Sequence, residues 1–312
     1  MKKAVKVAVV QATPVLFDLK KSVDKVCALI DECTLNQPDL ILFPESFIPC
    51  YPRSLTFGAE VGHRSADGKI LWQRYWQNSM PTTGEFINKI SKSVRKANAL
   101  VVLGVTEKDN ISGTLSCTML YFAPTGELVA KHRKLKPTGT ERLIWGEGDG
   151  STLTTLRTDF GIVGGLICWE NYMPLARMAM YQKGVEIYLA PTANARPQWQ
   201  STLQHIALEG RCFVLGCNQY VEKKNYPADL VPLLDGAPEV MCHGGSVIIS
   251  PSGEVLAGPL WDQEGILFAT LHEEEIIKGK MDFDVIGHYS RNDAFNFEIP
   301  DQPETIDIRI KK

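Results

Sequence analysis

Cys168 is the residue in this chain that is best placed for nucleophilic chemistry. It follows the apolar run Gly161-Ile-Val-Gly-Gly-Leu-Ile, and Asn171 stands ahead of Met-Pro-Leu-Ala-Arg. A buried strand holds the side chain at its end with little freedom, and this pattern predicts a helix with Asn171 as N-cap and Pro174 in its first turn. The N–H groups and dipole of such a helix favour a thiolate and can hold an anionic intermediate. A free cysteine at the end of a core strand is, however, most often an inert hydrophobic residue.

A cysteine nucleophile needs a proton acceptor and a group that stabilises developing negative charge. Glu45 ends a second apolar run, Leu40-Ile-Leu-Phe-Pro, and the basic run Lys131-His-Arg-Lys-Leu-Lys136 follows a third. Each also has an ordinary explanation, because a strand-end glutamate is usually solvated or capping and a basic run is usually a solvated edge. None of the six histidines lies in a cysteine-protease signature, and we expect structural roles for His205 and His288.

The elements that must position these groups alternate between short apolar runs and helical patterns. Apolar periodicity predicts helices over 20–35, 84–97, 173–183 and 198–210. Two strand, Pro-x-Gly turn, strand segments, at 121–129 and 249–256, predict β-hairpins. This order favours a mixed sheet, or two sheets faced by helices, over a purely parallel sheet. The predicted strands are 5–10, 40–43, 100–105, 118–122, 162–167, 187–190, 213–216, 247–249 and 266–270.

Three segments lack these patterns. Residues 53–80 and 221–245 are predicted to be long surface excursions, which tend to be functional inside a compact domain. From about Gly287 onward the chain is polar, and we expect it to be extended. The aromatic residues Trp72, Tyr75, Trp76 and Trp169 suggest either an aromatic-lined site or ordinary packing.

Length and composition are those of a globular enzyme. The 312 residues can form a single α/β domain, with 44% hydrophobic and 22% charged residues. The net charge of −3, with no block of one sign, argues against a nucleic-acid partner. No apolar run reaches the roughly 18 residues that a membrane span needs. We therefore expect no membrane association and a cytoplasmic location.

The N-terminal sequence does not indicate secretion, and the spacing of the cysteines does not indicate a metal site. Lys6 interrupts the first apolar run and Gln11 ends it, so the N-terminus is predicted to be a first buried strand rather than a signal peptide. Because the chain shows no secretory signal, no disulfide framework is expected. The eight cysteines lack the paired spacing of a zinc site, so no structural metal is predicted. They lie at positions 27, 33, 50, 117, 168, 212, 217 and 242.

Taken together, the segments around Glu45, the basic run and Cys168 resemble the nitrilase superfamily of carbon–nitrogen hydrolases. The form Cys168-Trp-Glu-Asn is similar to the true nitrilase branch rather than to the amidase or carbamoylase branches. The resemblance covers about nine-tenths of the chain in the expected order. It runs through Phe43-Pro-Glu45, His132-Arg-Lys-Leu-Lys-Pro-Thr138, Glu141-Arg-Leu-Ile-Trp-Gly, Gly148-Asp-Gly-Ser, Gly165-Leu-Ile-Cys-Trp-Glu-Asn-Tyr-Met-Pro-Leu-Ala-Arg177, Ala190-Pro-Thr192, His205-Ile-Ala-Leu-Glu-Gly-Arg and Asp284-Val-Ile-Gly-His-Tyr-Ser-Arg.

This resemblance implies a four-layer αββα sandwich of two mixed β-sheets flanked by helices. It implies hydrolysis of an organic nitrile to the carboxylic acid and ammonia through a covalent thioimidate and thioester on Cys168. Glu45 would be the general base and then acid, and Lys134 would stabilise the charge, with Lys131 and Lys136 as alternatives. Glu141 would help to place the substrate or the hydrolytic water. No metal or organic cofactor is implied.

The resemblance also implies substrate contacts and leaves alternatives open. Tyr51, Trp169 and Thr192 are expected to contact the substrate, although Cys50 stands next to Tyr51 where the family often has glycine. An amidase, carbamoylase or nitrile-hydrating relative would use the same Glu-Lys-Cys set. A non-catalytic binding protein of the same fold is a remote alternative.

The expected partners are a small nitrile, water and further copies of the chain. A homodimer or a higher homo-oligomer is expected, with a spiral as a further option. The chain ends soon after Ile308, without the long tail that in relatives is linked to filaments. A modest oligomer is therefore expected to be at least as plausible as a long spiral.

Overall fold

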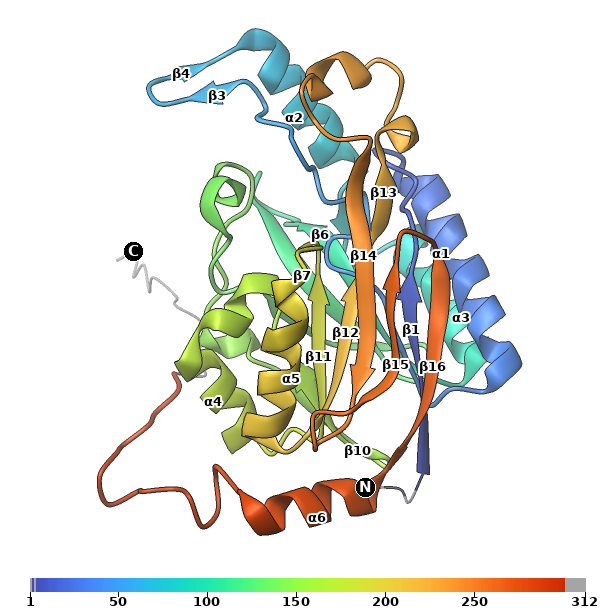
Figure 1. Ribbon diagram of the computed structural model, residues 1–312. Helices are drawn as coiled ribbons and strands as arrows, with labels where there is room; N and C mark the ends of the chain where they lie inside the picture. Colours follow the sequence, from blue (N-terminus) through green and yellow to red (C-terminus); the bar gives the residue numbers. More distant parts are fainter. Residues whose placement is uncertain (1, 3, 301–312) are drawn as a thin grey trace, which may run out of the picture.

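Two mixed β-sheets lie face to face in the centre of the protein (Figure 1). The computed structural model describes residues 2 and 4–300. In the first sheet the strands follow the order β16-β1-β2-β6-β7-β8, with β5 paired to β6. Its strands are β1 (Ala4–Gln11), β2 (Leu40–Leu42), β5 (Met80–Pro81), β6 (Leu100–Lys108), β7 (Leu115–Phe122), β8 (Leu128–Arg133) and β16 (Gly265–His272).

The second sheet has the order β13-β14-β12-β11-β10-β9, with β15 paired to β14. In each sheet the central strands of the order are parallel and the outer ones are antiparallel, while the short strand β5 pairs with β6 in parallel. The two predicted hairpins are present as β7–β8 and β14–β15. The strands are β9 (Thr155–Thr158), β10 (Gly161–Gly165), β11 (Ile187–Thr192), β12 (Phe213–Asn218), β13 (Tyr220–Glu222), β14 (Val240–Ile249) and β15 (Val255–Trp261).

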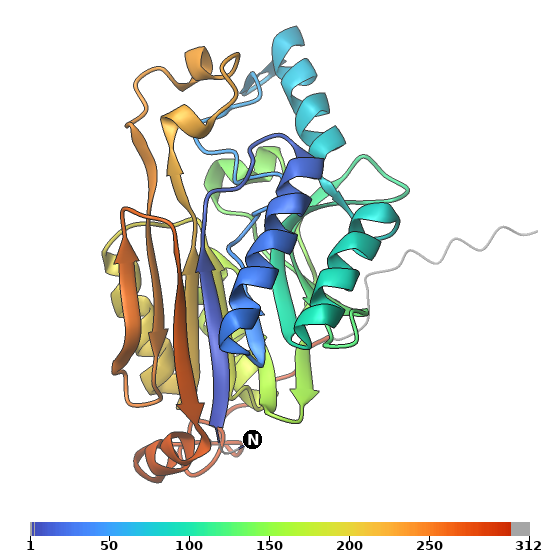
Figure 2. The same cartoon turned by 90° about the vertical axis from the view of Figure 1, so that its right-hand side faces the viewer.

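Helices cover the outer face of each sheet. Helices α1 (Leu19–Cys33) and α3 (Glu85–Ala97) lie side by side on the first sheet (Figure 2), and α4 (Pro174–Gln182) and α5 (Gln198–Gly210) lie on the second. One apolar core fills the space between the sheets, and each helix pair has a separate core against its sheet. The helical spacing of apolar residues in α1 explains which face of the helix packs on the sheet, because Val23, Val26 and Ile30 lie on that face and are buried. The predicted αββα sandwich is thus confirmed.

The segment 53–80 contains structure that its sequence pattern did not predict. The short strands β3 (Ala59–Glu60) and β4 (His63–Arg64) pair with each other, and α2 (Ala66–Asn78) follows them. The Ser65 hydroxyl caps α2 by accepting a hydrogen bond from the Gly68 amide. Because α2 fully buries little besides Tyr75, its apolar stripe is too weak to reveal a helix.

The segment 221–245 lies beside α2 at the upper end of Figure 1. It runs through two 3₁₀ turns, Lys223–Asn225 and Val231–Leu234, before β14 begins at Val240. At the opposite end, α6 (Glu273–Asp282) closes the fold, and the described residues 283–300 contain no helix or strand. The expected extended course is interrupted by hydrogen-bonded turns at 285–289 and 292–294. The chain end near Ile308, on which the expectation of a modest oligomer depends, lies outside the described residues. Within the described part of the chain, no helix is both long and apolar enough to cross a membrane.

Candidate active site

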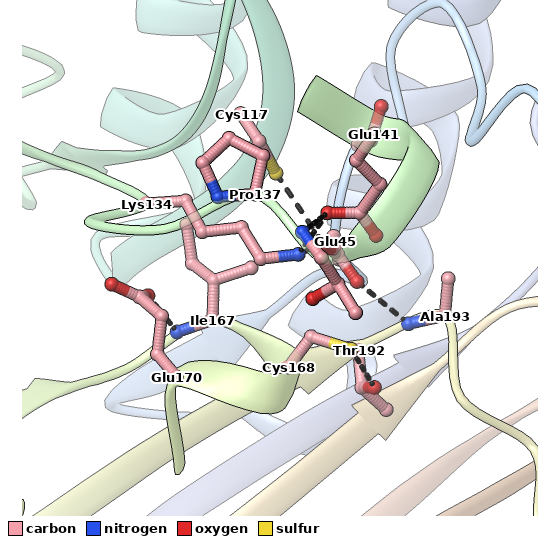
Figure 3. A network of polar contacts seen from close by, with 12 residues as sticks. Glu45, Cys117, Lys134, Pro137, Glu141, Ile167, Cys168, Glu170, Thr192 and Ala193 are labelled. Atoms are coloured by element: carbon pink, nitrogen blue, oxygen red, sulfur yellow. Dashed lines mark hydrogen bonds and ion pairs between the residues drawn. The ribbon is translucent and has the colours of Figure 1, made fainter. Parts of the chain in front are cut away.

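Three side chains that the sequence singled out meet at the ends of three strands. Lys134 directly follows β8, Glu45 follows β2 and Cys168 follows β10, and the three side chains point toward one another (Figure 3). The loop that carries Glu45 crosses β6 closely, so a Cβ on Gly104 would lie 2.0 Å from the Pro44 carbonyl oxygen. Gly104 is therefore required for Glu45 to reach this position.

The Lys134 ammonium lies between two carboxylates. Its Nζ is 2.7 Å from Glu45 Oε1 and 2.8 Å from Glu141 Oε2, and its side chain is fully buried. Burial alone would lower the pKa of Lys134, but Glu45 and other nearby groups raise it well above the ordinary value. The lysine is consequently a fixed positive charge at this point.

The other two lysines of the basic run have different partners. Lys131 Nζ is 2.6 Å from Glu107 Oε1, and Arg133 contacts the same carboxylate. Lys136 pairs with Glu147, and both of these side chains are about half exposed. Of the three candidate lysines, Lys134 is the one that contacts Glu45.

The Glu45 carboxylate is buried and held at both oxygens. Oε1 accepts from Lys134, and Oε2 accepts from the Ala193 amide at 2.8 Å. The Cys117 thiol donates to Oε1 over 3.5 Å. Burial raises the pKa of Glu45 above its ordinary value, while the charge of Lys134 opposes that rise. A carboxyl group in this environment can both take up and return a proton.

The backbone at Cys168 is strained. Its φ of 53° lies in the left-handed region, which residues with a side chain rarely adopt and which clusters at functional sites. Cys168 also begins a 3₁₀ turn, Cys168–Tyr172, and so follows β10 by three residues. This turn directs the sulfur toward Glu45 and Lys134 (Figure 3).

The predicted helix start beside Cys168 is partly wrong. Pro174 does stand in the first turn of α4, but the N-cap is Met173 and not Asn171. The Asn171 amide instead donates to the carbonyl oxygens of Leu166 and Cys168, at 2.9 and 2.8 Å. Asn171 therefore fixes the turn around the cysteine, which a capping pattern cannot distinguish from a helix start.

The expected preference for a thiolate at Cys168 is also wrong. Burial first, and then the negative charges of Glu45 and Glu141, raise the pKa of Cys168 to about 12. Lys134 and a hydrogen bond from Thr192 act in the opposite direction. At neutral pH the free sulfur is therefore protonated, and any nucleophilic step needs a base that removes this proton.

Glu141 lies within a 3₁₀ turn, Gly139–Leu143, and is saturated with donors. Its Oε2 accepts from Lys134 and from the Thr138 amide at 2.6 Å, and its Oε1 accepts from the Tyr51 hydroxyl at 2.7 Å. Tyr51 in turn lies edge-on to Trp145. Glu141 is thus held in one orientation beside Lys134.

A cavity of about 570 Å³ opens onto this group of residues. Cys168, Glu141, Tyr51 and Trp169 are among the residues that line it. Thr192 is not, and its hydroxyl donates to Cys168 Sγ over 3.0 Å from behind the sulfur. Of the three expected substrate contacts, Tyr51 and Trp169 thus lie on the cavity wall and Thr192 lies on the nucleophile.

The other aromatic residues of the suggested aromatic lining lie elsewhere. Tyr75 is fully buried and donates to the Cys50 carbonyl, Trp72 lines a neighbouring cavity and Trp76 packs under Lys108. Trp169, 38% exposed, is therefore the member of that group that a substrate in this cavity could meet.

The structure adds residues that the sequence reasoning did not select. Glu170 is buried and accepts from the Leu135 and Ile167 amides at 2.6 and 2.7 Å, and His132 Nε2 lies 3.0 Å from it. Arg53 lines the cavity, and Cys117 and the Ala193 amide contact Glu45. The carboxylate in Cys-Trp-Glu could have been suspected from its place beside Cys168, but a backbone amide leaves no trace in a sequence.

All eight cysteines are unpaired and buried. Among the described residues, no group of three or more His, Cys, Asp and Glu side chains is arranged to hold a metal ion. The histidines that we expected to be structural lie apart from the sulfur: His205 pairs with Glu209, and His288 packs on Tyr289.

Comparison with known proteins identifies the family. The carbon–nitrogen hydrolase family model matches residues 6–280. The chain is 44% identical to an aliphatic nitrilase of Sinorhizobium fredii, covering 96% of both chains. It is also 44% identical to a bifunctional nitrilase/nitrile hydratase of Lupinus angustifolius, covering 96% of this chain and 87% of that protein.

A solved structure shares the fold. It is a Saccharomyces cerevisiae member of branch 10 of the nitrilase superfamily, with a TM-score of 0.73 and 20% identity over 92% of this chain and 97% of that one. This structural similarity agrees with the arrangement of sheets described above. The chain therefore belongs to the carbon–nitrogen hydrolase family, in its nitrilase branch.

Proposed function

We propose that this protein hydrolyses an organic nitrile to the carboxylic acid and ammonia, with Cys168 as nucleophile, Glu45 as general base and acid, and Lys134 as electrostatic stabiliser. One observation carries the proposal. The Lys134 ammonium joins Glu45 and Glu141 at 2.7 and 2.8 Å, and Glu141 and Cys168 both line the same cavity. The nitrile substrate is supported by the names of the 44%-identical relatives.

The first step forms the carbon–sulfur bond. Because the pKa of Cys168 is raised to about 12, Glu45 must take the thiol proton as the sulfur attacks the nitrile carbon. The electron pair of the broken C–N π bond goes to nitrogen, which then receives that proton from Glu45. The product is a neutral thioimidate, and Glu45 is again a carboxylate. Its raised pKa suits both directions of transfer.

Two water molecules complete the reaction. The first adds to the thioimidate carbon, and one of its protons passes through Glu45 to nitrogen to give an amine. The remaining hydroxyl proton then passes to the same nitrogen as the carbon–nitrogen bond breaks, so ammonia leaves and a thioester is formed. The second adds to the thioester carbon, and the carbon–sulfur bond breaks to release the acid and the thiol. Lys134 stabilises the negative charge at each tetrahedral stage. Glu141 is held by three donors beside Lys134. It orients that lysine and helps to place the incoming water.

The second candidate is release of an amide. In the first tetrahedral intermediate, breakage of the carbon–sulfur bond rather than the carbon–nitrogen bond gives the amide instead of ammonia. A relative at 44% identity is named a bifunctional nitrilase/nitrile hydratase, which supports considering this branch. Which bond breaks depends on whether the nitrogen is protonated before the sulfur leaves.

Product analysis tests the proposal. Ammonia, acid and amide are measured by chromatography from one nitrile and from its matching amide. We expect acid and ammonia from the nitrile, with amide as a minor product. Turnover of the amide without turnover of the nitrile would contradict nitrile hydrolysis. No turnover and no intact-mass shift at Cys168 with nitriles would favour a binding protein.

We also propose that the protein forms homo-oligomers and works in the cytoplasm. Tyr172, Met173, Leu175 and Leu208 are large, partly or largely exposed side chains on α4, α5 and the turn before α4, and such apolar surface is typical of a contact between copies. Eight buried cysteines without a disulfide fit a reducing compartment. Light scattering on the purified protein measures the assembly, and a spiral would appear by electron microscopy.

A further inference from the structure

The cavity beside Cys168 carries an excess of positive charge. Arg53 and Arg196 both line it, and the carboxylate on its wall is Glu141. Both oxygens of Glu141 are already engaged by Lys134, Tyr51 and the Thr138 amide. His243, also on the wall, is 2.5 Å from Asp262. The positive charges of the two arginines are therefore available to a ligand that binds in the cavity.

Arg53 is the better placed of the two. It is half-buried, its guanidinium donates to the Ala193 carbonyl and it lies 5.2 Å from the centre of the Tyr51 ring. Ala193 directly follows Thr192 at the end of β11. The Arg53 guanidinium is hydrogen-bonded to Ala193 and the Cys168 sulfur to Thr192, so the two groups contact adjacent residues. Arg196 is exposed at the mouth and stacks on Trp169 at 5.5 Å.

Arg53 has unused hydrogen-bonding capacity. A guanidinium has five N–H donors; the Ala193 carbonyl accepts from one of them, and the Cys242 sulfur is a second hydrogen-bond partner. Within the described residues, no carboxylate forms an ion pair with Arg53. A partly desolvated cation without a counter-ion is costly unless a ligand supplies the missing acceptor.

We propose that Arg53 binds a carboxylate on the substrate, so that the preferred substrates are short nitriles that carry an acid group. This inference rests on the proposed nitrile hydrolysis. The planar fork of a guanidinium matches the two oxygens of a carboxylate. Arg53 and Cys168 line the same cavity and contact the adjacent residues Ala193 and Thr192. A substrate that reaches both therefore has a short carbon chain between its nitrile and its carboxylate. A neutral nitrile leaves Arg53 unpaired, which a polar site discriminates against.

The test compares two substrates of nearly equal shape. β-Cyanopropanoate carries the acid, and isocapronitrile has an isopropyl group in place of the carboxylate. We expect the wild-type protein to favour β-cyanopropanoate by about tenfold or more in kcat/KM, because a charge-assisted hydrogen-bonded pair contributes that much. In Arg53→Gln this preference disappears, mainly through a higher KM for the acid, while the loss on isocapronitrile is much smaller and reflects the lost hydrogen bond to the Ala193 carbonyl. Arg53→Lys keeps the charge without the fork and retains part of the preference.

Two further variants locate the effect. Arg157→Gln, an exposed arginine on β9 that does not line the cavity, is the matched control and should behave as wild type. Arg196→Gln should keep most of the preference. If Arg196→Gln, and not Arg53→Gln, removes it, the assignment to Arg53 is wrong. A wild-type preference for the neutral nitrile, or an equal loss on both substrates in Arg53→Gln, would also overturn the inference.

A binding measurement separates this inference from the proposed function. Calorimetry with Cys168→Ala measures the affinity for β-cyanopropanoate without turnover. Tighter binding of the acid than of isocapronitrile, lost in Cys168→Ala/Arg53→Gln, supports the anion site even if no nitrile is hydrolysed. Equal binding of the two compounds contradicts the site even if nitriles are hydrolysed.

Discussion

The Thr192 hydroxyl donates a hydrogen bond to Cys168 Sγ over 3.0 Å. Both side chains are almost completely buried, and Thr192 ends β11 while Cys168 follows β10. The two strands are parallel neighbours, so their carboxyl ends bring the hydroxyl behind the sulfur. This hydrogen bond lowers the pKa of the Cys168 thiol and so offsets part of the rise that burial causes.

Removal of that hydroxyl should therefore slow the reaction of the sulfur. Thr192→Val keeps the volume and loses the donor, so we expect about a fivefold lower kcat, equivalent to about 1 kcal/mol for one hydrogen bond. The rate of Cys168 alkylation by iodoacetamide, followed by peptide mapping, should fall in parallel at neutral pH. Thr192→Ser keeps the hydroxyl and should stay close to wild type. Equal rates in wild type and Thr192→Val would contradict a role for the bond.

Lys134→Met should abolish turnover and destabilise the fold. Without the ammonium, Glu45 and Glu141 remain buried beside each other, and an unpaired buried charge costs about 3–5 kcal/mol. Because Lys134 lowers the pKa of Glu45, its loss raises that pKa further, and Glu45 then takes up a proton more readily. Urea unfolding of this variant should accordingly show stability that recovers as the pH is lowered.

The matched control is Lys136→Met. Lys136 pairs with Glu147 on the surface, and such pairs contribute at most about 1 kcal/mol. If Lys136→Met lost activity and Lys134→Met kept it, the charge-stabilising role would belong to Lys136. Lys131→Met separates the remaining alternative, because that lysine contacts Glu107 instead.

His132 and Glu170 form a buried pair that should make stability depend on pH. Burial alone lowers the pKa of His132, but the charge and hydrogen bond of Glu170 raise it above the ordinary 6.5. The folded state therefore binds a proton that the unfolded state has released. This stabilisation is complete below pH 6.5 and is lost as the pH rises through the higher folded pKa.

Glu170→Gln should remove this dependence. Measurement of the free energy of unfolding from pH 5.5 to 9 should show a downward slope above 6.5 in wild type that is absent in the variant. Activity should fall as well, because the Glu170 carboxylate joins the Leu135 and Ile167 amides, next to Lys134 and Cys168. His63→Asn, an exposed histidine on β4, is the control and should keep the wild-type slope. An unchanged slope in Glu170→Gln would show that the His132–Glu170 pair is not its source.

Periodicity and strand-end logic predicted much of this structure. The apolar runs that lead to Glu45 and Cys168 are strands of the two sheets, and they could be recognised because buried strands need Val, Ile and Leu. The basic run was expected to follow a strand, but Lys131, His132 and Arg133 form the end of β8, a mostly unburied strand that lacks this signal. The helix α2 was missed because its buried side is narrow. The N-cap was placed at Asn171 because the same side chain serves a turn as well as a helix start.

The electrostatics of the site could not be obtained from spacing alone. A strand-end cysteine predicts a thiolate when the helix dipole dominates, but here the burial of Cys168 and the nearby Glu45 and Glu141 carboxylates outweigh it. Similarly, the donors that hold Glu45 include a backbone amide, and the Arg53 guanidinium donates to a backbone carbonyl instead of pairing with a carboxylate. Such features depend on contacts between distant segments.

The strained backbone of Cys168 should separate stability from function. Cys168→Ala removes the sulfur and should abolish turnover and the intact-mass shift with nitriles, while the positive φ of 53° still carries a side chain. Cys168→Gly also lacks the nucleophile, but glycine adopts this φ without steric conflict, and the relief amounts to about 1 kcal/mol. We therefore expect Cys168→Gly to unfold at a urea concentration at least as high as Cys168→Ala, although alanine is normally the more stabilising residue. A clearly less stable glycine variant would mean that the backbone at the nucleophile is not strained, and residual turnover in either variant would exclude Cys168 as the nucleophile.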